Sequence, residues 1–193
     1  MLRPLRPLLG ALVAATLALT ACTGKDAVDQ GSTSTTFKFK SGTPIGQLYP
    51  EAKRQPAADF TGKLISGAPF DLASTRGKPV VLNFWASWCG PCQTETPQFD
   101  LLYRKIKPEV DFVGVNTKDD KGKAEQFIKR NDITFPSVYD EAGETAIRLG
   151  NLPTVGLPFT VLIDKHSKVA AVYIARLSYN DLHNALDKLL AER

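Results

Sequence analysis

Residues 80–92 read V-V-L-N-F-W-A-S-W-C-G-P-C, and this stretch decides the fold of the chain. Its first six residues form a nearly continuous apolar run, a pattern that predicts a central strand buried on both faces. After the second cysteine, Phe99, Leu102 and Ile106 recur at helical spacing. The order of strand, cysteine pair and helix therefore predicts that Cys89 lies at the N-terminus of a helix.

Cys89 and Cys92 have the spacing of a redox-active pair. Free backbone N–H groups and the helix dipole stabilise a thiolate at a helix N-terminus, so Cys89 is the predicted nucleophile. Cys92 lies one turn further along and can form a disulfide with it, while Gly90 and Pro91 fit the tight turn and the first helical positions. One sulfur can attack a substrate disulfide and the other can resolve the mixed disulfide, which predicts thiol–disulfide exchange.

Two other roles for the pair agree less well with the sequence. A C-x-x-C pair can supply half of a zinc site, but zinc normally takes four ligands. The rest of the chain offers only Cys22, His166 and His183, none of them paired at ligand spacing. A purely structural disulfide would close a very short loop and would constrain the unfolded chain little. We therefore expect no metal and no cofactor.

The run W-C-G-P-C after V-V-L-N-F-W-A resembles the active-site region of the thioredoxin superfamily. The chain is more narrowly similar to the membrane-tethered TlpA/ResA-like branch of bacterial thiol–disulfide oxidoreductases. Asn83 stands where cytoplasmic thioredoxins usually carry a buried Asp, and Glu95 lies three residues after Cys92, where this branch commonly carries an acid. The branch also shares an extra segment at about 117–149 and the sequence R-G-K-P at 76–79.

This resemblance covers the chain from about residue 59 to the C-terminus and implies a thioredoxin-like α/β fold. The expected architecture is a central mixed sheet flanked by helices, with an N-terminal β-hairpin and a central insertion. Periodicity and turn residues divide the sequence in the same way. Strands are predicted at 60–65, 69–72, 79–85, 110–116, 135–139, 159–164 and 169–174, and helices at 89–106, 122–130, 144–149 and from Ser178 onward.

The resemblance also implies a substrate-binding surface. Pro158 is expected to form a cis peptide bond with Leu157 facing the disulfide, and the Leu157 backbone to receive a substrate chain. Without the resemblance Pro158 would be an ordinary turn residue, because cis X-Pro bonds are a minority state. Pro153 is the alternative, but it lies too early to adjoin the strand at 159–164. Trp88 is expected to shape the exposed surface of the site.

Glu95 has two interpretations. Most Glu residues in a first helical turn are solvated and simply complement the helix dipole. The other interpretation is a partly buried acid, on the same side of the helix as Cys92, whose pKa is raised by burial and which exchanges protons with that cysteine. On the second interpretation Glu95 joins Cys89 and Cys92 as a catalytic residue.

The N-terminus predicts an exported protein. Arg3 and Arg6 precede an apolar run at 8–19, which is too short to span a bilayer but typical of a signal peptide. The run ends in L-T-A-C, which resembles a lipobox with Cys22 as the lipidated residue. An ordinary signal peptide with an incidental Cys22, or an uncleaved anchor, is the alternative.

These patterns divide the chain into three predicted parts: a lipoprotein signal peptide at 1–21, a flexible linker at 22–43 and a thioredoxin-like domain at 44–193. The linker is rich in small polar residues that have little to bury. The net charge of +4 is mild and the charges are scattered, as in K-D-D-K at 118–121, so no nucleic-acid partner is expected.

The sequence as a whole predicts an extracytoplasmic thiol–disulfide oxidoreductase, anchored as a lipoprotein to a bacterial cell membrane. Its expected partners are protein thiols or disulfides and a membrane electron donor or acceptor. The branch resemblance implies a reductant, commonly of apocytochrome c in cytochrome c maturation. An oxidative, disulfide-forming protein of the same fold is one alternative. A non-catalytic metal-handling protein is another, although copper chaperones on this fold use C-x-x-x-C.

Overall fold

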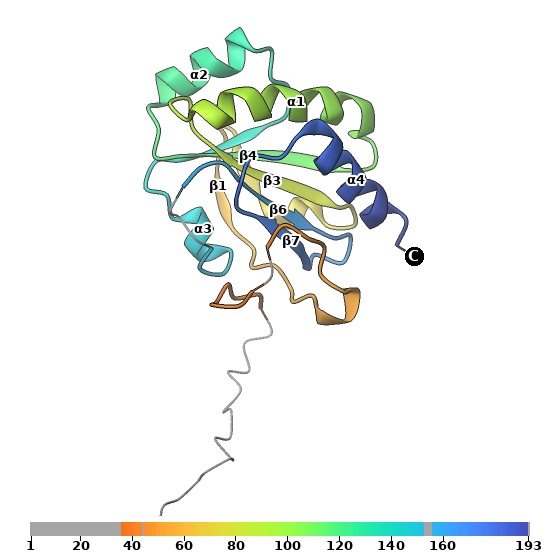
Figure 1. Ribbon diagram of the computed structural model, residues 1–193. Helices are drawn as coiled ribbons and strands as arrows, with labels where there is room; N and C mark the ends of the chain where they lie inside the picture. The colour runs from red at the N-terminus through yellow and green to blue at the C-terminus, as the bar shows by residue number, and fades with distance from the viewer. Residues whose placement is uncertain (1–35, 44, 153–155, 193) are drawn as a thin grey trace, which may run out of the picture. The chain divides into compact units, whose positions relative to one another are not determined.

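The structure is a computed structural model, and it describes residues 36–43, 45–152 and 156–192 (Figure 1). Every predicted strand and helix is present, and the bounds differ by at most two residues. The strands are β1 (Thr61–Lys63), β2 (Pro69–Asp71), β3 (Val80–Trp85), β4 (Asp111–Thr117), β5 (Ser137–Asp140), β6 (Phe159–Ile163) and β7 (Val169–Tyr173). The helices are α1 (Gly90–Ile106), α2 (Lys121–Arg130), α3 (Thr145–Arg148) and α4 (Tyr179–Leu190), with 3-10 helices η1 (Glu51–Lys53) and η2 (Leu72–Thr75).

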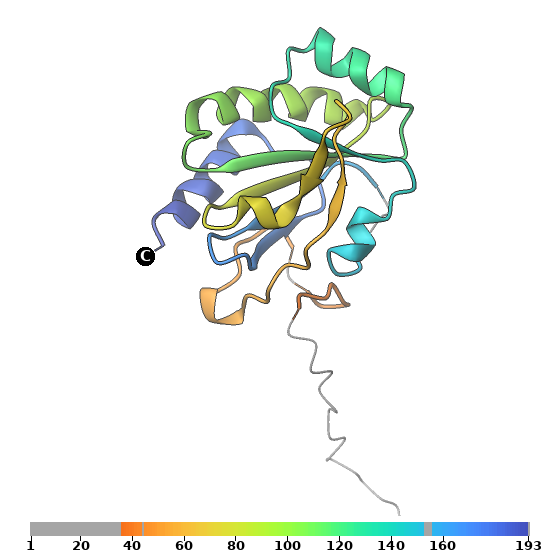
Figure 2. The ribbon, with the colours of Figure 1, turned by 180° about the vertical axis from the view of Figure 1, so that it is seen from behind.

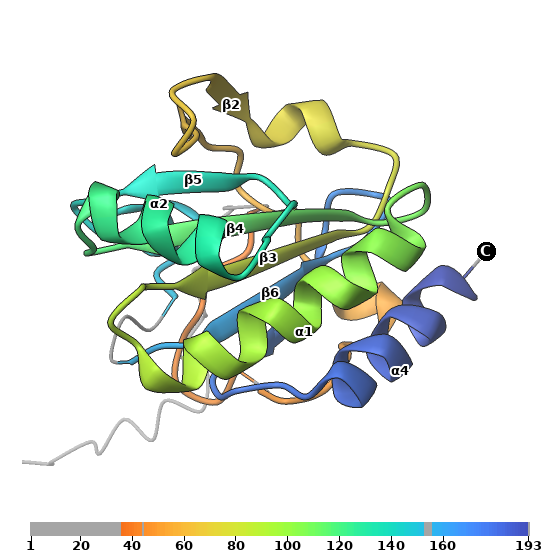
Figure 3. The ribbon, with the colours of Figure 1, turned by 90° about the horizontal axis from the view of Figure 1, so that it is seen from above.

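Five strands form one mixed sheet in the order β5-β4-β3-β6-β7. β4 runs parallel to β3 and β5, whereas β6 runs antiparallel to β3 and β7. Helices α1, α2 and α4 cover one face of the sheet (Figures 1 and 3), and α3 lies on the other (Figure 1). The β1–β2 hairpin stands beside edge strand β5, where Leu64 bridges to Val138 (Figure 2). The predicted mixed sheet flanked by helices is confirmed.

β3 lies at the centre of the sheet, and all six of its residues are buried. Its side chains alternate between two cores: Val81 and Trp85 join the core under α1 and α4, while Leu82 and Phe84 join the core of the opposite face. Asn83 shares the face of Val81 and Trp85. Asn83, the single polar residue of β3, therefore lies beneath α1.

Local capping fixes the starts of two further helices. The Asp120 side chain caps α2 by accepting a hydrogen bond from the Lys123 backbone N–H. Ser178 and Asp181 form a capping box at the start of α4, as their spacing predicts. The segment that the resemblance marks as a central insertion contains α2, β5 and α3, and β5 forms the edge of the sheet next to β4.

Residues 36–43 pack against the domain, although the sequence predicts a flexible linker up to residue 43. The Phe37 side chain is 6% exposed and stacks on Tyr49. The Phe37 backbone N–H donates a hydrogen bond to the carbonyl of Pro56. Phe37 and Phe39 alternate with lysines, a strand-like pattern that the composition of the linker obscures. Residues 36–43 therefore contact the domain that is predicted to begin at residue 44.

The predicted signal peptide and Cys22 lie among residues 1–35, outside the described residues. Within the described ranges, no helix is both long enough and apolar enough to cross a membrane.

Candidate active site

The cysteine pair lies at the N-terminus of α1, where β3 ends. Cys89 is the N-cap residue, and its Sγ accepts a hydrogen bond from the Cys92 backbone N–H at 3.2 Å. The two residues form a disulfide with their Cα atoms 5.2 Å apart. Pro91 lies in the first turn of the helix. Backbone N–H groups in this turn have no carbonyl partner within the helix, so the missing N–H of proline costs no hydrogen bond. Cys89 is 4% exposed and Cys92 is fully buried, so Cys89 is the more accessible residue of the two.

The Leu157–Pro158 peptide bond is cis, as the resemblance implies. β6 begins directly after Pro158 and runs antiparallel to β3. Because the C-terminal end of β3 leads into the cysteine pair, the antiparallel register brings Pro158 to the same edge of the sheet as the disulfide. Pro153, the alternative, lies outside the described residues.

Glu95 lies one turn beyond Cys92 on α1, and its side chain is fully buried. Its Oε1 accepts a hydrogen bond from the Leu177 backbone N–H at 2.6 Å, and its Oε2 accepts one from Asn83 Nδ2 at 2.9 Å. Burial raises the pKa of Glu95 to about 7, although both hydrogen bonds and the charge of Arg176 oppose that rise. Glu95 is therefore not a solvated surface acid.

A carboxyl group with a pKa near 7 can accept and release protons at neutral pH. Such a group can assist thiol–disulfide exchange, because the attacking species is the thiolate and each thiol must first lose its proton. The i, i+3 spacing places Glu95 on the side of α1 that carries Cys92. The arrangement can therefore couple disulfide chemistry at the surface to proton exchange in the core.

The loop before the disulfide is held by Asp119, which the sequence analysis did not single out. Asp119 is buried, and its carboxylate accepts hydrogen bonds from the Ser87 backbone N–H at 2.5 Å and the Ser87 hydroxyl at 2.8 Å. It also accepts a hydrogen bond from Asn116 Nδ2 at 2.8 Å. The neighbouring Lys118 carbonyl accepts the indole N–H of Trp88 at 2.9 Å. In the sequence Asp119 belongs to the mixed charge run K-D-D-K at 118–121, a pattern that is typical of a solvated surface.

Trp88 and Leu157, two of the predicted substrate-binding residues, share one recess in the surface. Trp88 is 60% exposed and lines a cavity of about 260 Å³ together with Leu157. Phe84 and Phe159, the strand residues behind them, give the recess an apolar floor. Trp88 directly precedes Cys89 in the chain, although neither cysteine lines the recess itself.

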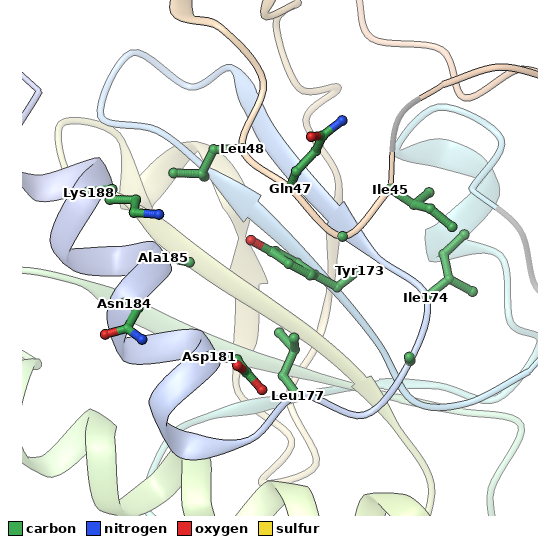
Figure 4. Close-up of a pocket in the computed structure, with 12 residues that line it drawn as sticks. Ile45, Gln47, Leu48, Tyr173, Ile174, Leu177, Asp181, Asn184, Ala185 and Lys188 are labelled. Carbon is green, nitrogen blue, oxygen red and sulfur yellow. The ribbon is translucent and has the colours of Figure 1, made fainter.

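A larger cavity, of about 710 Å³, lies between residues 45–48, the end of β7 and α4 (Figure 4). Tyr173 and Leu177 give it an apolar side, and Asp181 and Lys188 face it from α4. Neither cysteine lines this cavity. Leu177 links it to the disulfide region, because the same residue lines the cavity and donates its backbone N–H to Glu95.

The two histidines lie away from the cysteine pair in the fold. His166 belongs to the turn between β6 and β7, and His183 contacts Asp187 on α4 at 3.6 Å. In the part of the chain that the structure describes, no three His, Cys, Asp or Glu side chains are placed to hold a metal ion together.

Comparison with known proteins agrees with this geometry. A profile described as Redoxin matches residues 51–189. Thiol-disulfide oxidoreductase ResA of Geobacillus thermodenitrificans is 34% identical over 154 residues, which cover 79% of this chain and 82% of the relative. Thioredoxin-like protein YneN of Bacillus subtilis is 30% identical over 136 residues, covering 69% of this chain and 78% of that protein.

Solved structures give the same result for the fold. A DsbF homologue from Corynebacterium diphtheriae superposes with a TM-score of 0.75 and 34% identity, covering 80% of this chain and 99% of that one. A secreted thiol-disulfide isomerase from Corynebacterium glutamicum has a TM-score of 0.76 and 28% identity, covering 81% and 99% of the two chains. This chain therefore belongs to the Redoxin family and is a thiol–disulfide oxidoreductase of the ResA type.

Proposed function

We propose that this oxidoreductase works outside the cytoplasm as a lipid-anchored reductant of protein disulfides, with apocytochrome c as its substrate class. The observation that carries the proposal is the buried Glu95 one turn beyond Cys92, held by two hydrogen bonds and with its pKa raised to about 7. A proton exchanger of this kind lets the buried cysteine act as the resolving thiol at neutral pH. The dipeptide between the cysteines, Gly-Pro, matches thioredoxin, whose potential of about −270 mV lies toward the reducing end.

In the proposed cycle the Cys89 thiolate attacks one sulfur of a substrate disulfide. The substrate S–S bond breaks, a mixed disulfide with Cys89 forms, and the released substrate thiolate takes a proton. Cys92 then gives its proton to the Glu95 carboxylate and attacks the Cys89 sulfur, which releases the second substrate thiolate. That thiolate takes up a proton, so the substrate gains two electrons and two protons while the enzyme pair becomes a disulfide. A membrane electron donor would return the pair to its thiol form.

Trp88, Leu157 and Pro158 are proposed to bind the substrate chain beside Cys89. The cis bond turns the backbone of Leu157 at the start of β6, where an extended substrate segment could pair with it as an added strand. The recess between Trp88 and Leu157 would accept an apolar side chain near the substrate cysteine.

The membrane location rests on the lipobox-like sequence that ends at Cys22. An extracytoplasmic setting is also supported by the relative that is described as a secreted isomerase. Replacing Cys22 by Ala is expected to release the protein from the membrane fraction, and mass spectrometry of the native N-terminus is expected to find acyl chains on Cys22. An unacylated N-terminus would contradict the lipid anchor while leaving the exchange activity untouched.

Oxidation of substrates is the second candidate, because solved relatives are described as a DsbF homologue and a thiol-disulfide isomerase. The two directions differ in the reduction potential of the Cys89–Cys92 pair and in its redox state in cells. A reductant is expected to have a potential near that of thioredoxin, about −270 mV, and to be mostly dithiol in vivo. A potential near about −120 mV, as in DsbA, with a mostly oxidised pair in cells, would instead identify an oxidant.

A further inference from the structure

Asn83 is a polar residue in the apolar centre of the sheet that packing alone does not explain. It is 1% exposed and lies in β3 between Leu82 and Phe84, which are both fully buried. Its carbonyl oxygen Oδ1 has no hydrogen-bond partner. A buried acceptor without a partner destabilises a fold, and an apolar side chain of similar size would avoid that penalty. The amide therefore has a use other than stability.

The contacts of the Asn83 amide group show what that use is. Its Nδ2 donates one hydrogen bond to Glu95 Oε2 at 2.9 Å and another to Thr160 Oγ1 at 3.3 Å. Thr160 is fully buried and lies directly opposite Asn83 in the β3–β6 register. Both N–H groups of the amide are thus used, and its oxygen is the atom left unpaired.

The ionised carboxylate selects this orientation of the amide. Turning the amide by 180° would place Oδ1, an acceptor, against a carboxylate oxygen that is itself only an acceptor. Thr160 can accept or donate, so it holds the amide without dictating which way the amide faces. The Asn83 amide therefore directs its Nδ2 toward Glu95, and this orientation leaves its Oδ1 without a partner.

We propose that Asn83 is a positioning residue for proton exchange at Cys92: its amide fixes and favours the carboxylate form of Glu95, and Thr160 fixes the amide. This inference rests on the role of Glu95 in the proposed function. When Cys92 gives up its proton, Glu95 must receive it, and only the carboxylate form can do so. Loss of the Asn83 hydrogen bond leaves Glu95 protonated over more of the neutral range, so fewer molecules can accept that proton.

Within the described part of the chain, the groups around Glu95 come from the sheet, from the loop after β7 and from α1. β3 and β6 supply the neutral amide of Asn83 and the hydroxyl of Thr160. The loop after β7 supplies the Leu177 backbone N–H and the positive charge of Arg176. α1 supplies Cys92 itself, one turn before the acid. Of these groups, Asn83 is the side chain that donates to the carboxylate, which makes it the residue to test.

Asn116 provides a matched control. It is fully buried, its Oδ1 also lacks a partner, and its Nδ2 donates to a carboxylate, that of Asp119, at 2.8 Å. Its carboxylate partner anchors the loop before the disulfide and does not contact Glu95. Asn83→Leu and Asn116→Leu therefore remove equivalent buried amides, and only the first removes a donor to Glu95.

The experiment measures the ionisation of Glu95 in the oxidised protein by infrared spectroscopy of the carboxyl C=O band, assigned with Glu95→Gln. Asn83→Leu is expected to raise the pKa of Glu95 by about one to two pH units, because a hydrogen bond to the charged form is lost. Asn116→Leu is expected to leave the pKa of Glu95 unchanged. The pH profile of insulin reduction is expected to move upward with the pKa in Asn83→Leu.

An unchanged pKa of Glu95 in Asn83→Leu, or an equal shift in Asn116→Leu, would overturn the assignment. If Asn83→Leu does not fold, Thr160→Val tests the same arrangement, because it removes the hydroxyl that holds the Asn83 amide. Thr160→Val is expected to raise the pKa of Glu95. An unchanged pKa of Glu95 in Thr160→Val would also overturn the assignment. A shifted pKa with a rate–pH profile that overlays the parent would overturn the proton role of Glu95 in the proposed function. In that case the conclusion that the Asn83 hydrogen bond favours the carboxylate form of Glu95 would still hold.

Discussion

Replacing Glu95 by Gln is expected to remove a pH dependence from the stability of the oxidised protein. The ordinary pKa of this carboxyl group is 4.5, whereas burial raises it to about 7 in the folded protein. Between these two pH values the folded protein holds a proton that the unfolded chain has already lost. Stability therefore falls as pH rises through this window, and the full penalty is present above pH 7. Below pH 4.5 Glu95 is neutral in both the folded and the unfolded protein, so it contributes no stability penalty.

The size of the effect follows from the same two values. One pH unit corresponds to about 1.4 kcal/mol, so the rise in pKa corresponds to about 3 kcal/mol between the two ends of the window. Gln cannot ionise and keeps nearly the same shape, so the other titrating groups contribute equally to both proteins. The free energy of unfolding of Glu95→Gln minus that of the parent is thus expected to rise by about 3 kcal/mol from pH 4 to pH 8.

Urea denaturation of both oxidised proteins at several pH values measures this difference. The cysteines do not titrate while they form a disulfide, so they do not contribute to it. Stability curves for Glu95→Gln and the parent that run parallel over this range would refute the reasoning. Glu95 would then ionise as an ordinary surface acid does, and the proton exchange proposed for it would lose its basis.

Three further substitutions test the surrounding structure. Asp119→Ala leaves the Ser87 donors without their acceptor and is expected to destabilise the fold by about 2–3 kcal/mol and to slow insulin reduction, because the loop before the disulfide loses its anchor. Arg54→Met leaves buried Asp164 without its cation and is expected to destabilise by about 3 kcal/mol in urea denaturation; a change below about 1 kcal/mol would show that the pair adds little. Gly114→Ala drives a methyl group against the Ser137 hydroxyl and is expected to destabilise by about 1–3 kcal/mol, measured in the same way.

Local patterns were sufficient to predict most of the fold. The apolar run that forms β3 and the serine–aspartate spacing that caps α4 each act within a few residues of the chain, so the sequence displays them directly. The cysteine pair is equally local, since strand, turn and helix are consecutive. The cis bond before Pro158 was predictable only through the family resemblance, because nothing in the neighbouring residues requires it.

Long-range packing determines the features that local patterns do not predict. Asp119 and Asp120 are identical neighbours, yet one is buried beneath the active-site loop and the other caps a helix at the surface. Phe37 belongs to a segment of linker-like composition and is buried by residues far along the chain. The role of Asn83 likewise depends on Thr160 and Glu95, which meet it only after the sheet forms.

The central claim is that Cys89 attacks the substrate and Cys92 resolves the mixed disulfide. The most direct test expresses Cys92→Ser and Cys89→Ser separately in cells and isolates mixed disulfides by non-reducing electrophoresis and mass spectrometry. Cys92→Ser is expected to accumulate covalent complexes through Cys89, because no second thiol remains to release the substrate. Cys89→Ser is expected to trap none, since Cys92 is fully buried. Complexes of the same proteins trapped by Cys89→Ser, and absent from Cys92→Ser, would contradict the account.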